Sequence, residues 1–382
     1  MAKSLMFILL LSLSIPAFLF AQQESDDEIQ VNMNSYFDNF RLTVLYPSVN
    51  ITKNIDSKTT VTGSYLVDAI SSATMKMTFK VDGITSATEN KQGGSDNTPD
   101  ELRHQFNLGI SRNILGATVS ADGIYSTEHD YSSKTIAANV SLPFAKKNTV
   151  FQIGFAGNWD KVFPQTRTWT KDRNTATLNF GLTQILSKKM VSQFDFSFIN
   201  MDGFMLDGYQ VVRIINGSTI KTLEPVEPDK RVRRSAGLRI NFGLTKLSTI
   251  LLGYRYYWDT WDINSHTFDA EYKTHLSEHV NISIGLRQYF QTSAYFFKPE
   301  YTVPEPFMSV DGKLNSGYTN QISFDMSVKG SKDLDVPIIN NDKVTFISSI
   351  GIYHRHTDSP DWAMRIKELY AYLISFGFKI SI

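Results

Sequence analysis

Apolar and polar side chains alternate without a break over residues 370–382. One face carries Tyr370, Tyr372, Ile374, Phe376, Phe378, Ile380 and Ile382. The other face is mostly small or polar. Successive side chains of a strand point to opposite faces, so this alternation predicts one β-strand. A strand of this length with a continuous apolar face is typical of a transmembrane barrel, whose strands turn that face toward lipid.

The same period of two recurs along most of the chain. Each segment is about ten residues long or a little more, the length that crosses a bilayer when the strand is tilted. Apolar rows start at Leu102, Phe151, Ala176, Phe194, Val232, Ile250, Val280, Ile322 and Val344. A soluble sandwich or β-helix would need polar faces on these strands, and rows such as residues 370–382 argue against it.

Short and long connections alternate between these rows, as they do in outer-membrane barrels, where short turns face the periplasm. The short polar turns are expected at residues 53–58, 112–113, 143–148, 187–189, 245–248, 276–278 and 329–342. The longer links are expected at residues 71–100, 126–133, 160–173, 200–230, 291–316 and 354–367. We predict an all-β fold, a transmembrane antiparallel β-barrel of about 16 strands, within a range of roughly 14 to 18. Residues 28–34, with a turn at Asp38-Asn39, are expected to pair with residues 370–382 and close it.

The first residues have the pattern of a secretory signal peptide. Lys3 supplies the positive charge, an apolar run follows over residues 5–20, and Ala21 is a suitable last residue before cleavage. A retained membrane anchor is the alternative, but the run is short and Pro16 interrupts it. We expect a signal peptide at residues 1–21 and an outer-membrane barrel domain at residues 22–382. Its partners would be outer-membrane lipid and the barrel-assembly machinery.

Composition narrows the function further. The chain has 382 residues and a formal net charge of +0, from 38 basic and 38 acidic residues. No basic excess draws it to nucleic acid. It contains no cysteine, which excludes a lipoprotein anchor, a disulfide framework and a thiolate nucleophile. No nucleophile-elbow, Walker or dinucleotide-binding motif occurs in a strand-to-helix context, so we expect no enzymatic activity.

Charged residues fall on the face opposite the apolar rows, where a barrel lumen tolerates them. They are Arg231, Arg233, Arg239, Arg255, Asp269, Glu271, Lys273, Arg287 and Asp325. Because both signs occur, the sequence allows two interpretations. These side chains line a wet pore, or they form ion pairs that brace a filled barrel.

One internal repeat stands out. Residues 67–74 read VDAISSAT and residues 81–88 read VDGITSAT. Together with the Tyr46-Pro47-Ser48 segment before it and the barrel pattern after it, this doublet resembles the domain-of-unknown-function family 3570 of predicted outer-membrane β-barrel proteins. The resemblance covers most of residues 22–382. It implies the fold and the location and carries no settled activity.

The doublet also resembles, over a shorter stretch, the motif to which flavin transferases attach FMN through a phosphoester. The matching pattern is Asp-x-Ile-[Ser/Thr]-Ser-Ala-Thr, with Ser72 and Ser86 where the motif has glycine. This resemblance implies Thr74 and Thr88 as covalent FMN acceptors and a periplasmic flavin transferase as a partner.

Three weaker groups could bind a metal. His354 and His356 share a strand face with Asp358 nearby, and residues 128–130 read Glu-His-Asp. Asp68 and Asp82 of the doublet could supply oxygen ligands to calcium. Each group is equally explained as a polar rim or loop tip, and we assign no metal site.

The sequence therefore predicts a non-enzymatic outer-membrane pore or a membrane platform for loops and partners. A flavinylated redox component is one alternative. A surface adhesin or receptor, suggested by the long links at residues 200–230 and 291–316, is another. Single-channel conductance separates the pore from the other two.

Overall fold

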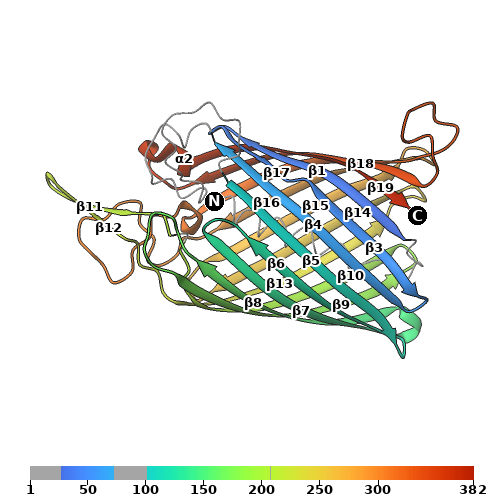
Figure 1. The fold of residues 1–382 in the computed structure, drawn as a ribbon, viewed down its shortest axis with the longest axis horizontal. Helices are drawn as coiled ribbons and strands as arrows, with labels where there is room; N and C mark the ends of the chain where they lie inside the picture. Colours follow the sequence, from blue (N-terminus) through green and yellow to red (C-terminus); the bar gives the residue numbers. More distant parts are fainter. Residues whose placement is uncertain (1–26, 73–100, 207) are drawn as a thin grey trace.

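The computed structural model describes residues 27–72, 101–206 and 208–382, and they form one closed antiparallel barrel (Figure 1). The main sheet contains 17 strands, of which β2 and β3 follow one another in the same position, so the barrel has sixteen strand positions. The strands are β1 (Glu28–Asp38), β2 (Leu42–Leu45), β3 (Ser48–Asp56), β4 (Thr59–Ser72), β5 (Glu101–Ile114), β6 (Ala117–Thr127), β7 (Tyr131–Phe144), β8 (Thr149–Val162), β9 (Lys171–Ser187), β10 (Met190–Gly203), β13 (Lys230–Gly243), β14 (Ser248–Asp259), β15 (Asn264–His275), β16 (Val280–Gln291), β17 (Gly317–Lys329), β18 (Val344–Thr357) and β19 (Glu368–Ser381). The predicted all-β barrel of about 16 strands is confirmed.

The remaining elements lie in the connections. A separate hairpin consists of β11 (Val212–Asn216) and β12 (Thr219–Leu223). Short helical turns are η2 (Ala145–Lys147), η3 (Gly312–Leu314), η4 (Asp361–Ala363) and α2 (Met364–Lys367). No helix in the described ranges is long and apolar enough to cross a membrane.

The barrel closes where the sequence analysis places the closure. Strand β1 pairs with β19 along its whole length, from Glu28 opposite Ser381 to Asp38 opposite Ala371.

The next strand position is interrupted at Tyr46-Pro47, because proline has no N–H to donate to a ladder. Pairing continues through the interruption, since Tyr46 N donates to Asn34 O at 2.9 Å and Val67 N donates to Pro47 O at 3.2 Å.

The outer face of the barrel is apolar, as the alternation predicts. Side chains such as Leu108, Ile322 and Tyr372 are exposed by 66%, 53% and 52%. Lipid would cover these side chains in a bilayer. Near one end of the barrel, tyrosine and histidine meet on this outer face: Tyr254 Oη lies 2.8 Å from His266 Nδ1. Such side chains suit the membrane–water interface because they join an apolar body to a polar tip.

The two ends of the barrel differ. At the short-turn end, on the right of Figure 1, the strands join through brief connections except for the longer one between β17 and β18. At this end Ile382 N donates to Asp27 O at 2.8 Å. At the long-loop end, on the left, lie the β11–β12 hairpin and α2. One short turn is shifted from its expected position at residues 112–113, which remain inside β5. The turn lies at Leu115-Gly116, whose φ angles of 52° and 87° suit the tight hairpin turn with two positive φ values.

Several of the expected long links contain more strand than predicted. Residues Asp160 and Arg173 were placed at the ends of a link, yet they lie opposite each other within β8 and β9. Strands β10 and β18 likewise run on to Gly203 and Thr357. These polar residues continue the inward rows past the apolar band, which is why the apolar pattern alone ends too early.

Placing a charge on the outer face should destabilise the barrel. We expect Ile322→Arg, at an outward position of β17, to lower the free energy of unfolding in lipid vesicles by about 2–4 kcal/mol. Ser323→Arg is the matched control, because Ser323 faces the lumen between Gly285 and Gly351. An equal loss of unfolding free energy in the two variants would contradict the assignment of Ile322 to the lipid face and Ser323 to the lumen.

Removing half of the closing strand should block assembly. Deletion of residues 375–382 leaves parts of β1 and β18 with unpaired backbone groups, which the bilayer interior does not tolerate. We expect the deleted protein to lack heat-modifiable electrophoretic mobility. A deletion of residues 332–339, within the connection between β17 and β18, should keep it. Normal mobility of the first deletion would show that β19 is not the essential closure.

Candidate functional site

The lumen wall carries a stripe of charged residues on β10, β13, β14, β15 and β16. The strand register places Asp195, Gly237 and Arg255 side by side across β10, β13 and β14. The next row holds Arg239, Gly253, Asp269 and Arg287 across β13 to β16. We call these two rows the charged stripe.

Glycines in the charged stripe make room for its carboxylates. A Cβ atom built on Gly237 would lie 2.7 Å from Asp195 Oδ2, which is too close for a real side chain. A Cβ on Gly253 would lie 3.2 Å from the Cβ of Asp269. The Asp195 carboxylate therefore lies over the backbone of β13 instead of projecting into the lumen. Missing side chains on one strand keep polar side chains of the next strand flat against the wall.

Several lumen charges are paired, and most of these pairs lie near the long-loop end. Arg231 Nε donates to Asp259 Oδ2 at 2.9 Å, and Tyr257 Oη donates to the same oxygen at 2.6 Å. Arg173 Nε donates to Asp160 Oδ2 at 2.9 Å. Charge-assisted hydrogen bonds of this kind hold neighbouring strands in register. For these residues the bracing interpretation of the sequence is correct.

Other lumen arginines have no such partner. In residues 27–72, 101–206 and 208–382, Arg239 and Arg255 form no hydrogen bond and no ion pair within 4.0 Å. Arg233 Nε is buried without a hydrogen-bond partner in the same ranges. The bracing interpretation therefore does not describe Arg239 and Arg255, and a wet pore lined by these residues stays a prediction.

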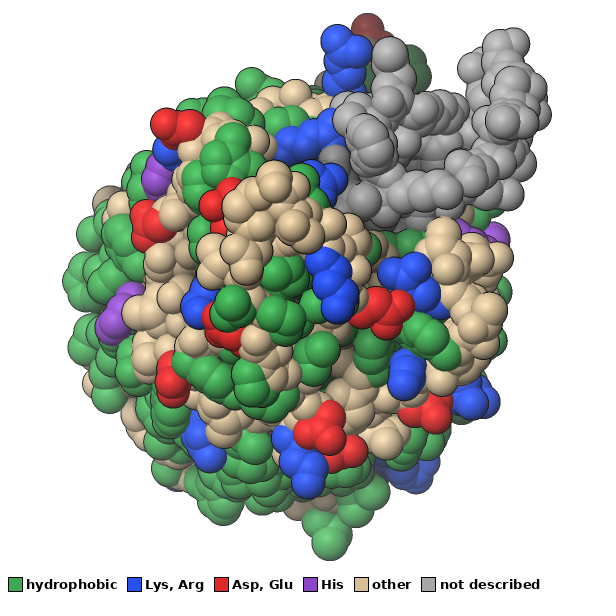
Figure 2. Space-filling model, turned by 90° about the vertical axis from the view of Figure 1, so that its left-hand side faces the viewer, with side chains coloured by type: hydrophobic (Ala, Val, Ile, Leu, Met, Phe, Trp, Pro, Cys, Tyr) green, Lys and Arg blue, Asp and Glu red, His purple; other side chains and the backbone are tan. Residues whose placement is uncertain are grey.

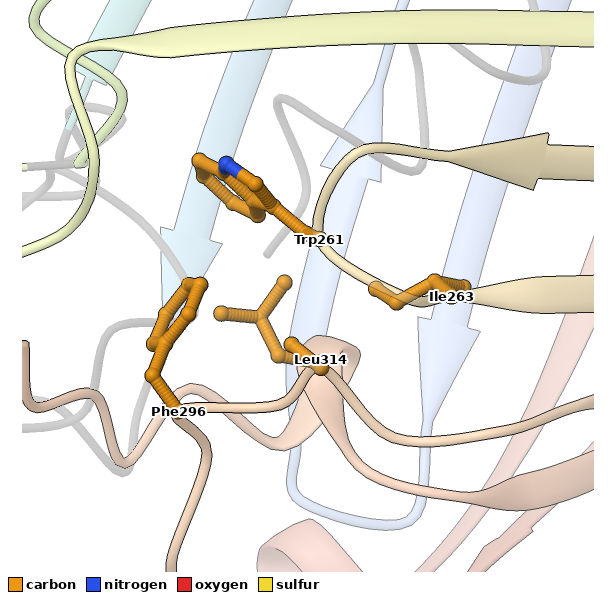
Figure 3. Close-up of a cluster of buried hydrophobic side chains, with 5 residues drawn as sticks. Trp261, Ile263, Phe296 and Leu314 are labelled. Atoms are coloured by element: carbon orange, nitrogen blue, oxygen red, sulfur yellow. The ribbon is translucent and has the colours of Figure 1, made fainter.

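An apolar cluster lies at the long-loop end of the lumen (Figure 3). Trp261 and Ile263 come from the turn between β14 and β15, and Phe296 and Leu314 come from the loop between β16 and β17. We call this cluster, with Ala294, the loop cap. Backbone hydrogen bonds join its parts: Tyr295 N donates to Trp261 O at 3.1 Å. Burial of this apolar surface, together with these backbone hydrogen bonds, holds the loops against each other.

The loop cap is attached to the barrel through Arg231. The guanidinium carbon of Arg231 lies 4.1 Å from the centre of the Trp261 ring, within the range of a cation–π contact. Trp261 Nε1 also donates to Lys230 O at 3.1 Å. Because Arg231 is also paired with Asp259, one side chain links the cap to the ion pairs of the wall.

A second apolar cluster anchors the projecting hairpin. Val212 and Ile214 of β11 pack with Tyr301 and Met308. Tyr301 Oη donates to Phe296 O at 2.7 Å and accepts from Ser309 N at 2.9 Å, and burial raises the pKa of this phenol. The β11–β12 hairpin then extends away from the barrel (Figure 1). Figure 2 shows the long-loop end with apolar, basic and acidic side chains intermixed, as expected for a water-exposed surface.

A cavity of about 520 Å³ lies at the short-turn end, inside the wall made by β14 to β19. Eight of its 17 lining residues are serine or threonine, and Ser283 Oγ donates to Asp325 Oδ2 at 3.1 Å. The polar side chains of the lining include Ser248, Thr249, Lys273, His275, Ser349 and Ser375. The lumen thus combines a hydroxyl-rich cavity, a charged stripe and an apolar cap.

Of the residues singled out in the doublet, the structure describes Asp68 but not the two threonines. Thr74, Thr88 and Asp82 lie outside the described residues. Asp68 lies on β4 and is 2% exposed.

The two neighbouring histidines are held by a residue that the sequence analysis did not include. His354 Nε2 lies 2.8 Å from Glu368 Oε2, and His356 Nδ1 lies 2.6 Å from Glu368 Oε1. Asp358 instead accepts a hydrogen bond from Ser316 Oγ at 2.5 Å. Among the described side chains, no group of three or more histidine or acidic residues is arranged to hold a metal ion.

Residues 128–130 are part of the loop packing. Asp130 accepts a hydrogen bond from Tyr209 Oη at 2.7 Å, and Glu128 lies 3.7 Å from Arg103 Nε. Both carboxylates are buried, so the expected polar loop tip is an internal contact. Asp195 was missed, although its place between Phe194 and Phe196 marks it as inward-facing.

Solved structures with the same architecture are outer-membrane barrels. A bacterial polysaccharide outer membrane secretin matches with a TM-score of 0.51 and 8% identity, over 94% of this chain and 100% of that one. The CymD monoaromatic hydrocarbon channel matches with a TM-score of 0.44 and 8% identity, over 94% of this chain and 90% of that one. OccK8 (OprE) of Pseudomonas aeruginosa matches with a TM-score of 0.45 and 8% identity, over 92% of this chain and 97% of that one. At such low identity the match to the secretin shows the fold alone.

Sequence comparison supports the resemblance drawn from the doublet. Curated proteins give no match to the chain. The family model described as "Protein of unknown function (DUF3570)" matches residues 10–171 and 159–338. These two segments together span most of the chain, which therefore belongs to the DUF3570 family.

Proposed function

We propose that this protein is a passive, non-enzymatic channel for small hydrophilic solutes across the outer membrane. The observation that carries the proposal is the contrast between the two faces of the sheet. Outward residues are apolar, whereas the lumen holds the charged stripe and a hydroxyl-rich cavity of about 520 Å³. Barrels with 16 to 18 strands are wide enough to leave an aqueous passage.

The glycines of the charged stripe support passage. Because Asp195 lies over Gly237, its carboxylate stays at the wall and leaves the centre of the lumen to water. A barrel filled by its own side chains would place large residues at these inward positions. The loop cap then narrows the long-loop mouth.

The proposal predicts stepwise ionic conductance. We expect purified protein in planar lipid bilayers to give discrete current steps whose size rises with salt concentration, because ions cross through the polar lumen. Heat-modifiable mobility checks that the inserted protein is folded. A folded barrel without conductance would contradict the channel.

Variants of the loop cap test whether it restricts the current through the long-loop mouth. Phe296→Ala combined with Leu314→Ala removes apolar contacts of the cap without touching the strands, so openings should become longer or more frequent. Val336→Ala, in an exposed connection at the short-turn end, should leave the current unchanged. Unchanged current from both variants would show that the cap does not control the mouth.

Covalent flavin attachment is a second proposal, and it depends on the sequence of the doublet. After co-expression with a flavin transferase, the mature protein should gain the mass of one FMN for each modified threonine. Replacing Thr74 and Thr88 by alanine should abolish the gain. An unchanged intact mass of the natural sequence under these conditions would exclude the modification.

A further inference from the structure

Two arginines of the charged stripe lie close together on neighbouring strands. Arg239 on β13 is opposite Gly253, and Arg255 on β14 is opposite Gly237. The two are therefore diagonal neighbours, whose positions in a sheet lie roughly 7–8 Å apart. The Asp195 carboxylate lies over Gly237, and Asp269 lies closest over Gly253, so both acids of the charged stripe stay flat against the wall beside the two arginines.

The acids near this pair do not neutralise it. The charged groups around Arg255 are Asp195, Arg239, Arg287 and Asp269. Asp269 is engaged by Arg287, whose Nε donates to it at 2.6 Å. Three arginines against two carboxylates leave an excess of one positive charge. Within the described ranges, neither Arg239 nor Arg255 forms an ion pair within 4.0 Å.

A further positive charge, that of Arg233, lies on β13 nearer the long-loop mouth. Arg233 of β13 lies two inward positions before Gly237, and its nearest acid, Asp259, is already paired with Arg231. Arg239 and Arg255 are only partly buried, so an incoming solute can reach them. A partly buried charge without a partner is costly, and a bound counter-ion would lower that cost.

Resting on the channel function proposed above, we propose that Arg239 and Arg255 form a binding site for small anions bearing a carboxylate or phosphate group. Guanidinium groups match the geometry of these anions, because their parallel N–H groups donate to two oxygens at once. Arg233 would attract the anion from the mouth.

Ion selectivity tests this site. In planar bilayers under a potassium chloride gradient, the reversal potential of the natural protein should show a preference for chloride. R239Q combined with R255Q should reduce the chloride-to-potassium permeability ratio by on the order of tenfold, the low end of the counter-ion enrichment in a charged cleft. R213Q, on the exposed strand β11, removes an arginine outside the barrel and should leave the ratio unchanged.

Direct binding separates the site from the channel. Isothermal titration of the detergent-solubilised barrel with inorganic phosphate and, separately, with succinate shows which anion class binds, and R239Q/R255Q should abolish the heat of binding. Phosphate or succinate binding without any conductance would support the site and overturn the channel. Conductance without anion preference and without binding would overturn the site and leave the channel intact. Absence of both would overturn both.

Discussion

The structure depends on closing the hydrogen-bond ladder of the sheet. In a bilayer no water satisfies backbone N–H and C=O groups, so a sheet can span only if its two edge strands pair with each other. Here β1 pairs with β19 along the whole length of β1. Once the sheet is closed, every residue of a strand faces either lipid or lumen. Alternation in the sequence then becomes a division between an apolar outside and a polar inside.

That division explains how the charges are arranged. An inward carboxylate such as Asp259 needs a partner within reach, and the register brings Arg231 to it from the neighbouring strand. Arg231 also stacks on Trp261, so the ion pair fixes the position of the loop cap as well as the strands. Two of the apolar clusters lie at the loops, and a third, around Leu42 and Val44, lies on the strands next to the closure, whereas much of the lumen wall is held by polar contacts.

Much of the fold could be predicted from the sequence, because lipid imposes a strict period on the apolar face. The closing pair and nearly all short turns lie where the alternation ends. The boundaries beyond the apolar band were harder to place: Asp160 and Arg173 look like loop residues, although they are paired strand residues. The charged stripe was predicted only as a set of inward charges. Whether Arg239 has a partner depends on register across three strands, which no single segment of sequence contains.

The glycines of the wall also bear on how such a barrel can change over evolution. Lumen width is usually discussed as a matter of strand number, which cannot change without rebuilding the closure. In this protein the free space also depends on single absent Cβ atoms, as at Gly237 and Gly253. One substitution at such a position would push a neighbouring charge off the wall and toward the axis. The size and charge of the passage are thus adjustable one residue at a time, while the backbone stays the same.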